Sequence, residues 1–494
     1  MSVAPPAASP PRDWVPGTRD LLIAGEFASP RGEHWPVYNP ATEEVIAMVG
    51  GASAEQVDAA VAAARAAFPG WAALSGDERS RHIHRLADVL DRAAGHLLPS
   101  IVNEVGTPVS LAAFLQVRMA VQHHLRWAAD AAKADRIQHL GRWDEPVPTI
   151  SDVVLEPVGV VAAITGYNYP LNLAVFKFGA ALAAGCTVVL LPSPRTPLTT
   201  LFLGELIRQA ELPAGVMNVI TGNADAGRQL SSHPGVDRVS FTGSDTVGAM
   251  IMAQAARSLT GVTLELGGKS PSIVLPDADV RQVAVETHLR WSRNGGQGCA
   301  ALARLLVHES VYDEFLEASE PAFRQMVVGD PWDPATSIGP MIRPDHQARV
   351  HGFIDDSLAA GGRKLLEVAK PLPGRGWFVN PVLLGNLPHD APAVQQEIFG
   401  PVAVISPFKD TDDAVRLAND TPYGLAANVW CGDNLAEGRR IAERIRAGTV
   451  WINGGGSMRP DAPFGGYGRS GIGRELGEWG IREYLEVKHI QWRV

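Results

Sequence analysis

Cysteine is scarce in this chain, with three residues among 494. Cys186, Cys299 and Cys431 include no C-x-x-C pair, and an odd number of cysteines cannot close a disulfide framework. No cluster of Cys and His has the spacing of a tetrahedral zinc site, so we expect no bound metal. Free thiols are typical of a reducing compartment, and we expect the protein in the cytoplasm.

Charged residues are also few, at 19% of the chain, and the net charge is −10. An acidic surface repels phosphates, so neither nucleic acid nor an anionic membrane is expected as a partner. The longest uncharged stretch, Pro157–Phe176, is interrupted by Gly166 and Pro170, which indicates strand, loop and helix and not a membrane span. Residues 1–19 are rich in Pro and Ala, lack the features of a signal peptide, and are expected to be a disordered lead-in.

The rest of the sequence alternates between helical and strand patterns. A capping box at Ser53 begins an amphipathic helix that we expect to end near Pro69 and Gly70. From residue 159 to 262, short β-branched runs alternate with helical segments, and a second such series follows Cys299. This order predicts an α/β protein with parallel sheets covered by helices on both faces. The length predicts about three domains.

Three turn segments follow predicted strands, where parallel sheets bind their ligands. "FTGSDTVG" (241–248) joins a strand to a helix, so its N–H groups could receive a phosphate, or it is an ordinary helix cap at Ser244. Asn168 in "GYNYP" offers an amide donor, although such an asparagine more often bonds its own turn. Glu265 in "LELGGKSP" ends an apolar strand, where a carboxylate is either salt-bridged or catalytic.

The segment "NGGQGCA" (294–300) surrounds Cys299 with glycines and two amide side chains. A lone cysteine is commonly a small buried apolar residue. Here the neighbours supply many backbone donors and little bulk, so the site could stabilise a thiolate and a nearby oxyanion. The sequence therefore indicates Cys299 as a candidate nucleophile.

Taken together, these segments resemble the aldehyde dehydrogenase superfamily over residues 20–490. The similarity is carried, in order, by "YNPAT" (38–42), "EPVGVV" (156–161), "YNYP" (167–170), "FTGS" (241–244), "LELGGKSP" (264–271), "GQGCA" (296–300), "QEIFGPV" (396–402) and "PFGGYGRSGIGRE" (463–475). The resemblance implies a Rossmann-like cofactor domain (20–140 and 155–262), an α/β catalytic domain (263–483) and a small β oligomerisation flap (141–154 and 484–494). An exposed strand edge in that flap needs pairing, so a homodimer or homotetramer is expected.

The resemblance also implies the chemistry. Cys299 would attack an aldehyde, with the oxyanion held by the Asn168 side chain and the Cys299 N–H. After hydride transfer, Glu265 would act as general base for the water that hydrolyses the thioester, with Lys177 and Glu475 supporting proton transfer. Relatives that pass the acyl group to coenzyme A usually lack this glutamate, so a free carboxylic acid is the expected product.

The implied cofactor is NAD or NADP. Its expected ligands are Thr165, Gly166, Tyr167, Gly243, Ser244, Val247, Leu266, Gly267, Glu397 and Phe399. The chain departs from the family where Leu191 replaces a lysine and Pro194 a glutamate at the adenosine ribose. The missing glutamate would have repelled the 2′-phosphate of NADP, and Arg195 follows Pro194 directly, so we expect that NADP is accepted. Alternatively, Arg195 points to solvent and both cofactors bind modestly.

The substrate is open between two classes. Arg293 and Arg459 could recognise a carboxylate, which favours a semialdehyde, or both are solvated charges at the rim. Tyr169, Phe176 and Phe464 could instead receive an apolar or aromatic aldehyde. Two other functions are alternatives to an aldehyde dehydrogenase: a catalytically impaired binding or structural protein, and a thiol esterase that uses Cys299 without a cofactor.

Overall fold

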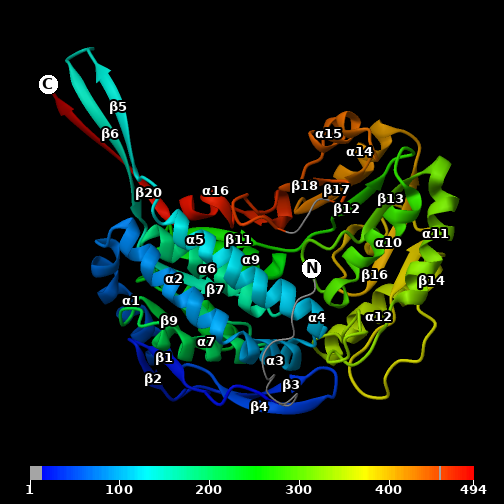
Figure 1. Ribbon diagram of the computed structural model, residues 1–494, viewed down its shortest axis with the longest axis horizontal. Helices are drawn as coiled ribbons and strands as arrows, with labels where there is room; N and C mark the ends of the chain where they lie inside the picture. The colour runs from blue at the N-terminus through cyan, green and yellow to red at the C-terminus, as the bar shows by residue number, and fades with distance from the viewer. Residues whose placement is uncertain (1–13, 455–457) are drawn as a thin grey trace.

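The computed structural model describes residues 14–454 and 458–494 and contains two large sheets, each covered by helices on both faces (Figure 1). The first sheet has eight strands, of which the central five are parallel. Their order is β19 (Gly471–Ile472), β11 (Gly261–Glu265), β10 (Arg238–Thr242), β7 (Val160–Ile164), β8 (Thr187–Leu191), β9 (Met217–Val219), β1 (Leu21–Ile23) and β2 (Glu26–Ala28). The predicted α/β class is confirmed.

The central strands are buried on both faces because their apolar residues are continuous. In β7, Val161 and Ala163 pack on one side, while Val160 and Ala162 pack on the other, as the two-residue strand period requires. Helices of the first side are α2 (Gly76–Arg92), α3 (Ala94–Val105), α5 (Arg126–Ala131), α6 (Pro170–Ala184) and α7 (Leu198–Gln209). Helices of the second side are α1 (Ala54–Ala72), α8 (Ala224–Ser231) and α9 (Asp245–Ala255).

The second sheet has seven strands, all parallel to their neighbours except the edge strand β14. Their order is β14 (Arg363–Glu367), β15 (Val382–Gly385), β16 (Val402–Phe408), β13 (Arg304–His308), β12 (Pro271–Val274), β17 (Ala426–Trp430) and β18 (Thr449–Ile452). The helices of this half are α10 (Val280–Trp291), α11 (Tyr312–Gln325), α12 (Pro344–Ala359), α13 (Pro392–Gln395), α14 (Thr411–Asn419) and α15 (Leu435–Ala442).

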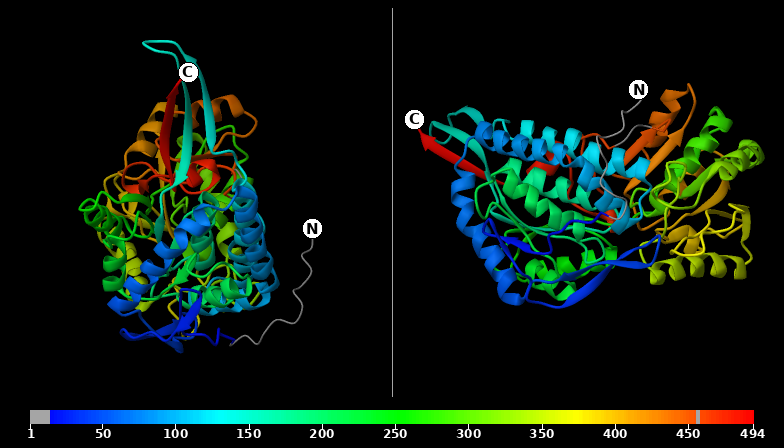
Figure 2. Two further views of the ribbon diagram at one scale, coloured as in Figure 1. Left: turned by 90° about the vertical axis from the view of Figure 1, so that its left-hand side faces the viewer. Right: turned by 60° about the horizontal axis from the view of Figure 1, so that its bottom comes forward.

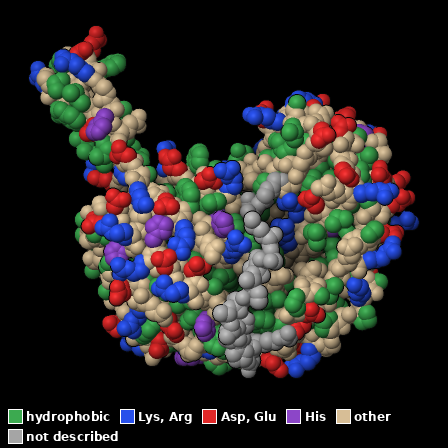
Figure 3. All heavy atoms as spheres, in the orientation of Figure 1, with side chains coloured by type: hydrophobic (Ala, Val, Ile, Leu, Met, Phe, Trp, Pro, Cys, Tyr) green, Lys and Arg blue, Asp and Glu red, His purple; other side chains and the backbone are tan. Residues whose placement is uncertain are grey.

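A third, antiparallel sheet projects away from the body as an arm, as all three views show (Figures 1 and 2). It consists of β5 (Ile137–Trp143), β6 (Thr149–Pro157) and β20 (Leu485–Arg493). The strands predicted for residues 141–154 therefore begin earlier and end later. Apolar side chains on the arm face solvent, among them Trp143, Val487 and Trp492. Figure 3 shows green, hydrophobic atoms gathered along the arm.

The chain returns to the first sheet before it enters the arm. Strand β19 pairs antiparallel with β11, and α16 (Gly477–Arg482) lies against α6. The remaining elements are the hairpin β3 (His34–Asn39) and β4 (Glu44–Gly50), α4 (Val109–Leu111), the π-helix η1 (Ala112–Leu125), and the short turns η2 (Arg293–Gly296), η3 (Glu309–Val311) and η4 (Gly468–Ser470). Within residues 14–454 and 458–494, no helix has the length and apolarity needed to cross a membrane.

Two expected boundaries are shifted in the structure. Helix α1 continues through Pro69 to Ala72, because Trp71 is buried in the first core and holds the last turn in place. The expected lead-in extends too far: residues 1–13 lie outside the described residues, but Trp14 is in place. Its ring packs edge-on against His96 at 5.0 Å and Phe202 at 5.5 Å, and this aromatic contact orders the segment that follows.

Candidate active site

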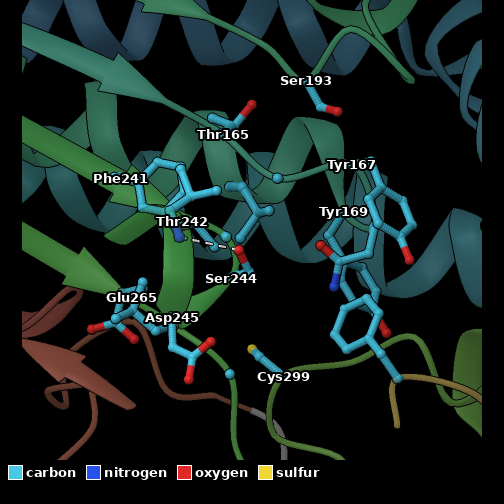
Figure 4. Close-up of a pocket in the computed structure, with 18 of the residues that line it drawn as sticks. Thr165, Tyr167, Tyr169, Ser193, Phe241, Thr242, Ser244, Asp245, Glu265 and Cys299 are labelled. Atoms are coloured by element: carbon cyan, nitrogen blue, oxygen red, sulfur yellow. Dashed lines mark hydrogen bonds between the residues drawn. The ribbon is translucent and has the colours of Figure 1, made fainter. Parts of the chain in front are cut away.

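A cavity of about 1290 Å³ lies at the carboxyl ends of the parallel strands. Strands β7, β8, β10 and β11 end there, and Thr165, Leu191, Thr242 and Glu265 at or next to these ends line the cavity. Figure 4 shows Thr165, Thr242 and Glu265. Open parallel sheets bind their ligands at this edge. The sulfur of Cys299 points into the same space, with Glu265 on one side and Tyr169 on the other (Figure 4).

The glycines before Cys299 serve the backbone more than the substrate. Asn294, Gly295 and Gly296 have φ values of 53°, 64° and 71°, the left-handed region that glycine tolerates best. A Cβ on Gly296 would lie 2.1 Å from the carbonyl oxygen of Gly400. Only Gly298 faces open space, since a Cβ there would meet nothing closer than the Tyr169 hydroxyl at 3.9 Å. The loop therefore turns sharply, packs against Gly400, and leaves one side free beside the thiol.

Buried hydrogen bonds hold this loop in place. The Gln297 side chain donates to the carbonyls of Asn294 and Pro340 and accepts from the Ile342 N–H and the Tyr167 hydroxyl. Asn294 is fixed in turn from outside the loop: its side-chain Oδ1 accepts from the Thr107 hydroxyl at 2.7 Å, and the Gln116 side-chain amide donates to Thr107 at 2.9 Å. Thr107 and Gln116 were missed by the sequence analysis, because nothing in their local sequence indicates a partner almost 190 residues away.

Asn168 lies beside this loop and is 5% exposed. One N–H of its side-chain amide donates to the Gln297 carbonyl at 2.9 Å, and its own backbone carbonyl accepts from Asn294 at 3.1 Å. The amide carries a second N–H, and Asn168 lines the cavity. The side chain is thus oriented by protein contacts while a donor is left for a ligand.

Burial raises the pKa of the Cys299 thiol to about 12, and the charges of Glu265 and Glu397 contribute in the same direction. The thiol is therefore protonated at neutral pH. Since the thiolate is the nucleophilic form, a group in the site must remove the proton as the sulfur attacks.

Glu265 ends β11 and is 3% exposed. Neither of its carboxylate oxygens has a hydrogen-bond partner among the described residues. Burial and the neighbouring charge of Glu475 raise its pKa well above the ordinary carboxyl value, against the opposing charge of Lys177. A buried carboxyl group without partners is rare in a merely structural role, and a raised pKa suits a general base that works near neutral pH.

Lys177 and Glu475 form a fully buried ion pair behind Glu265. The Lys177 Nζ lies 2.6 Å from Glu475 Oε1 and 3.2 Å from the Ser240 hydroxyl. Lys177 comes from the interior of α6, and Glu475 comes from the segment that returns to the first sheet. Glu475 lines the cavity, whereas Lys177 reaches the site only through this pair.

The ten residues expected to hold the cofactor all line the cavity. Helix α9 begins beside it, where the Ser244 hydroxyl accepts from the Val247 N–H. Glu397 accepts a hydrogen bond from the Gly268 N–H at 3.0 Å, and burial raises its pKa to about 7. A Cβ on Gly267 would lie 2.3 Å from Glu397, so the glycine is needed for this approach. A helix N-terminus beside a glycine-lined cradle fits a dinucleotide.

Two further lining residues were missed by the sequence analysis. His346 lies with its Nε2 atom 2.7 Å from the Phe399 carbonyl oxygen, and Arg349 donates to the carbonyls of Glu397 and Ile398. Both lie on α12, one turn apart, and so hold the segment that carries two expected cofactor ligands. Their spacing on one helix face was the only signal in the sequence.

Comparison with known proteins settles the family. The Aldehyde dehydrogenase family model matches residues 27–490. The chain belongs to the aldehyde dehydrogenase family. It is 39% identical to human Aldehyde dehydrogenase 1A1 over 94% of this chain and 92% of that protein. It is 37% identical to the chloroplastic betaine aldehyde dehydrogenase of Beta vulgaris over 96% of each chain.

Solved aldehyde dehydrogenase structures superpose closely. The NAD+ complex of the Bacillus cereus enzyme has a TM-score of 0.92 at 37% identity, over 96% of each chain. A mutant of aldehyde dehydrogenase C from Pseudomonas syringae, in complex with NAD+ and octanal, has the same TM-score and identity, over 97% of this chain and 98% of that one. This aldehyde dehydrogenase is therefore an NAD(P)-dependent oxidoreductase that acts on aldehydes.

The cavity of this aldehyde dehydrogenase is apolar next to Cys299. One cluster joins the aromatic rings of Tyr169, Phe176 and Phe464 to the thiol, and its other members are Leu173, Leu425, Leu476, Met458 and Ala300. All three aromatic residues expected at the substrate end are therefore brought together there.

The two arginines do not converge. Arg459 does not line the cavity; it is exposed and forms a two-point ion pair with Asp461, with a shortest distance of 2.6 Å. Its expected place at the substrate is wrong, because a carboxylate two residues along the chain satisfies it locally. Arg293 does line the cavity, but the residue is exposed.

Proposed function

We propose that this enzyme oxidises an aldehyde to the free carboxylic acid through a thioester on Cys299 that water hydrolyses. One observation supports the proposal most directly: a thiol, an amide donor and an unpaired carboxyl group from three distant segments share one cavity. NAD+ or NADP+, when bound, accepts the hydride from the carbon that was the aldehyde carbon.

The first step makes the covalent adduct. The Cys299 sulfur forms a bond to the carbonyl carbon as its proton passes to Glu265, whose raised pKa suits it to receive a proton. The carbonyl oxygen gains negative charge and accepts hydrogen bonds from the free Asn168 N–H and the Cys299 backbone N–H. Because the buried network around Gln297 orients these donors beforehand, little reorganisation accompanies the reaction.

The second step releases the acid. Glu265 first releases to bulk solvent the proton it took from Cys299. It then removes a proton from water as the water oxygen bonds to the thioester carbon; the carbon–sulfur bond breaks, and the departing sulfur takes the proton back from Glu265. The unpaired oxygens of Glu265 leave its carboxylate free to bind that water. The buried pair of Lys177 and Glu475 holds a compensated charge next to Glu265 and positions it for proton transfer.

We propose that the enzyme accepts NADP as well as NAD. Leu191 and Pro194 line the adenosine end of the cavity and bring neither the lysine nor the acid of the family pattern. Arg195 lines the same end, although its guanidinium also lies 5.4 Å from the Tyr167 ring centre and 3.7 Å from Asp345. The proposal is supported if NADP has a lower dissociation constant than NAD and the NADP constant rises in Arg195→Ala. Equal dissociation constants for NAD and NADP that stay unchanged in Arg195→Ala contradict it.

The substrate is proposed to be an apolar or aromatic aldehyde. The aromatic cluster beside Cys299 supports this class, and the ion pair of Arg459 with Asp461 weakens the semialdehyde alternative. The bound octanal of the Pseudomonas syringae neighbour is compatible with an apolar channel. Rates of NADH formation with benzaldehyde, octanal and succinic semialdehyde test the choice, and a clear preference for the semialdehyde contradicts it.

The arm of β5, β6 and β20 is proposed to pair with a second copy in a homodimer or homotetramer. Its exposed apolar residues, including Trp143 and Trp492, support an interface, since a long apolar strand edge is a hazard for a monomer. We also propose that the chain divides into a cofactor domain, a catalytic domain and the flap, and that the protein is cytoplasmic. Light scattering of the intact chain gives the oligomeric state.

A catalytically impaired binding protein is the second candidate, favoured only by Leu191 and Pro194. NADH formation by the wild-type enzyme that disappears in Cys299→Ser excludes it. Hydrolysis of a nitrophenyl ester without NADH formation from any aldehyde supports instead the thiol esterase.

A further inference from the structure

The π-helix η1 forms one wall of the cavity and decides which of its residues face inward. Leu115, Met119 and His124 all line the cavity. Leu115 and His124 are nine residues apart. In an α-helix of 3.6 residues per turn they would lie on opposite faces, whereas about 4.4 residues per turn, as the wider i→i+5 winding gives, places them on one face. The unusual winding therefore turns His124 into the cavity.

His124 brings an unpaired polar group to this apolar region. The residue is 4% exposed, and its Nδ1 atom is buried without a hydrogen-bond partner among the described residues. Its ring packs edge-on against Phe176 at 4.7 Å, next to the aromatic cluster that contains Cys299. Burial lowers the pKa of His124 to about 4, so the ring is neutral at physiological pH and carries one donor and one acceptor.

Asn172 supplies a second unpaired polar atom in the same part of the cavity. Its side-chain N–H group donates to the Leu115 carbonyl at 2.8 Å and thereby ties α6 to the π-helix. Its Oδ1 atom is buried without a partner in the described chain. Both residues line the cavity, so they bring hydrogen-bonding capacity that no described residue satisfies to an otherwise apolar wall, and native interiors seldom leave such groups unsatisfied.

We propose that His124 recognises a hydroxyl group on the substrate, so that aromatic aldehydes carrying a ring hydroxyl are preferred over unsubstituted or methylated ones. The inference rests on the proposed oxidation at Cys299 and specifies its substrate class. A hydroxyl both donates and accepts, as does a neutral imidazole, while the rings of Phe176 and Tyr169 match the flat body of such a substrate. A carboxylate is a poor match, because neither His124 nor Asn172 carries positive charge.

The test compares para-hydroxybenzaldehyde with para-methylbenzaldehyde, which have nearly the same shape, and repeats the pair with the meta isomers. The measured quantity is the ratio of kcat/KM for the hydroxyl compound to that for the methyl compound. We expect the wild-type ratio to be about 10 or more for at least one isomer, the value of one good hydrogen bond. His124→Phe should lower this ratio about tenfold, through KM, while His124→Gln, which keeps a donor and an acceptor, should retain part of it.

His123→Phe is the matched control, because His123 is the exposed neighbour on the same helix and should leave the ratio unchanged. A wild-type ratio near 1 for both isomers overturns the inference, as does an equal fall of both rates in His124→Phe with an unchanged ratio. These results differ from failure of the proposed function, in which neither aldehyde yields NADH or turnover persists in Cys299→Ser.

Discussion

Substitution of a single glycine in the loop before the nucleophile provides a direct test of how the site is built. Gly296 has φ +71°, and a Cβ added there would lie 2.1 Å from the Gly400 carbonyl oxygen and 2.3 Å from its carbon. Gly298, two residues nearer to Cys299, has no contact closer than 3.9 Å. Gly296→Ala and Gly298→Ala thus add the same methyl group to one loop, with opposite steric consequences.

The cost of Gly296→Ala has two parts. A non-glycine residue in the left-handed region costs about 1–2 kcal/mol. The Cβ must also move away from the Gly400 carbonyl by about 1 Å before the contact is tolerable, and a displacement of that size near reacting groups lowers the rate about 100-fold. Gly298→Ala carries neither cost, so its folding stability should equal that of the wild type.

Thermal unfolding and alkylation of Cys299 by iodoacetamide measure the two effects separately. We expect Gly296→Ala to lower the melting temperature and to change both the alkylation rate and kcat/KM, while Gly298→Ala leaves the melting temperature unchanged. If both variants melt alike, or if Gly296→Ala is fully active, the reasoning that the glycine serves close packing against Gly400 is refuted.

Three further predictions concern charges in and around the cavity. The acidic limb of the pH–rate profile should lie well above the pH range in which ordinary carboxyl groups titrate, because Glu265 must be ionised to act and its pKa is raised. Glu475→Gln should shift that limb to lower pH, since the substitution removes a negative charge that raises the pKa of Glu265. A shift to higher pH would contradict the assignment of the limb to Glu265. The same Glu475→Gln variant should lower the free energy of unfolding by about 3–5 kcal/mol, because it leaves the Lys177 charge buried and unpaired. In chemical denaturation, the double variant Glu475→Gln with Lys177→Met should regain much of the lost stability. Leu191→Lys should tighten NAD+ binding about tenfold in a fluorescence titration, because it adds a charged donor at the ribose. Leu191→Met is the control. Equal NAD+ affinities of Leu191→Lys and the wild type would rule out a role of this position at the ribose.

The fold could be predicted from the sequence where a single residue pattern determines the structure. Continuous apolar strands such as β7 and β8, separated by helical segments, can be stable only as a parallel sheet covered on both faces, and this was predicted correctly. Boundaries were less predictable where distant contacts decide them. The end of α1 depends on the burial of Trp71, and the position of Trp14 depends on its contacts with His96 and Phe202.

The site divides in a similar way. Cys299, Glu265 and Asn168, which line one cavity, were predicted as site residues because each lies in a distinctive segment of the chain. Thr107 and Gln116 could not be found, since their role exists only through hydrogen bonds between segments far apart in sequence. The inward position of His124 was equally hidden, because the choice between α and π winding shifts a side chain across the helix without any local signature.

The covalent intermediate is the most direct test of the central claim. Glu265→Gln should form the thioester on Cys299 slowly, because Glu265 takes the thiol proton, and should hydrolyse it more slowly still. Intact-protein mass spectrometry after prolonged incubation with NAD+ and an aldehyde should therefore detect an added acyl group. Peptide mapping should place that group on the peptide that contains Cys299, and Cys299→Ser should show none. Formation of NADH by Glu265→Gln at the wild-type steady rate, with Cys299 unmodified throughout, would contradict the mechanism.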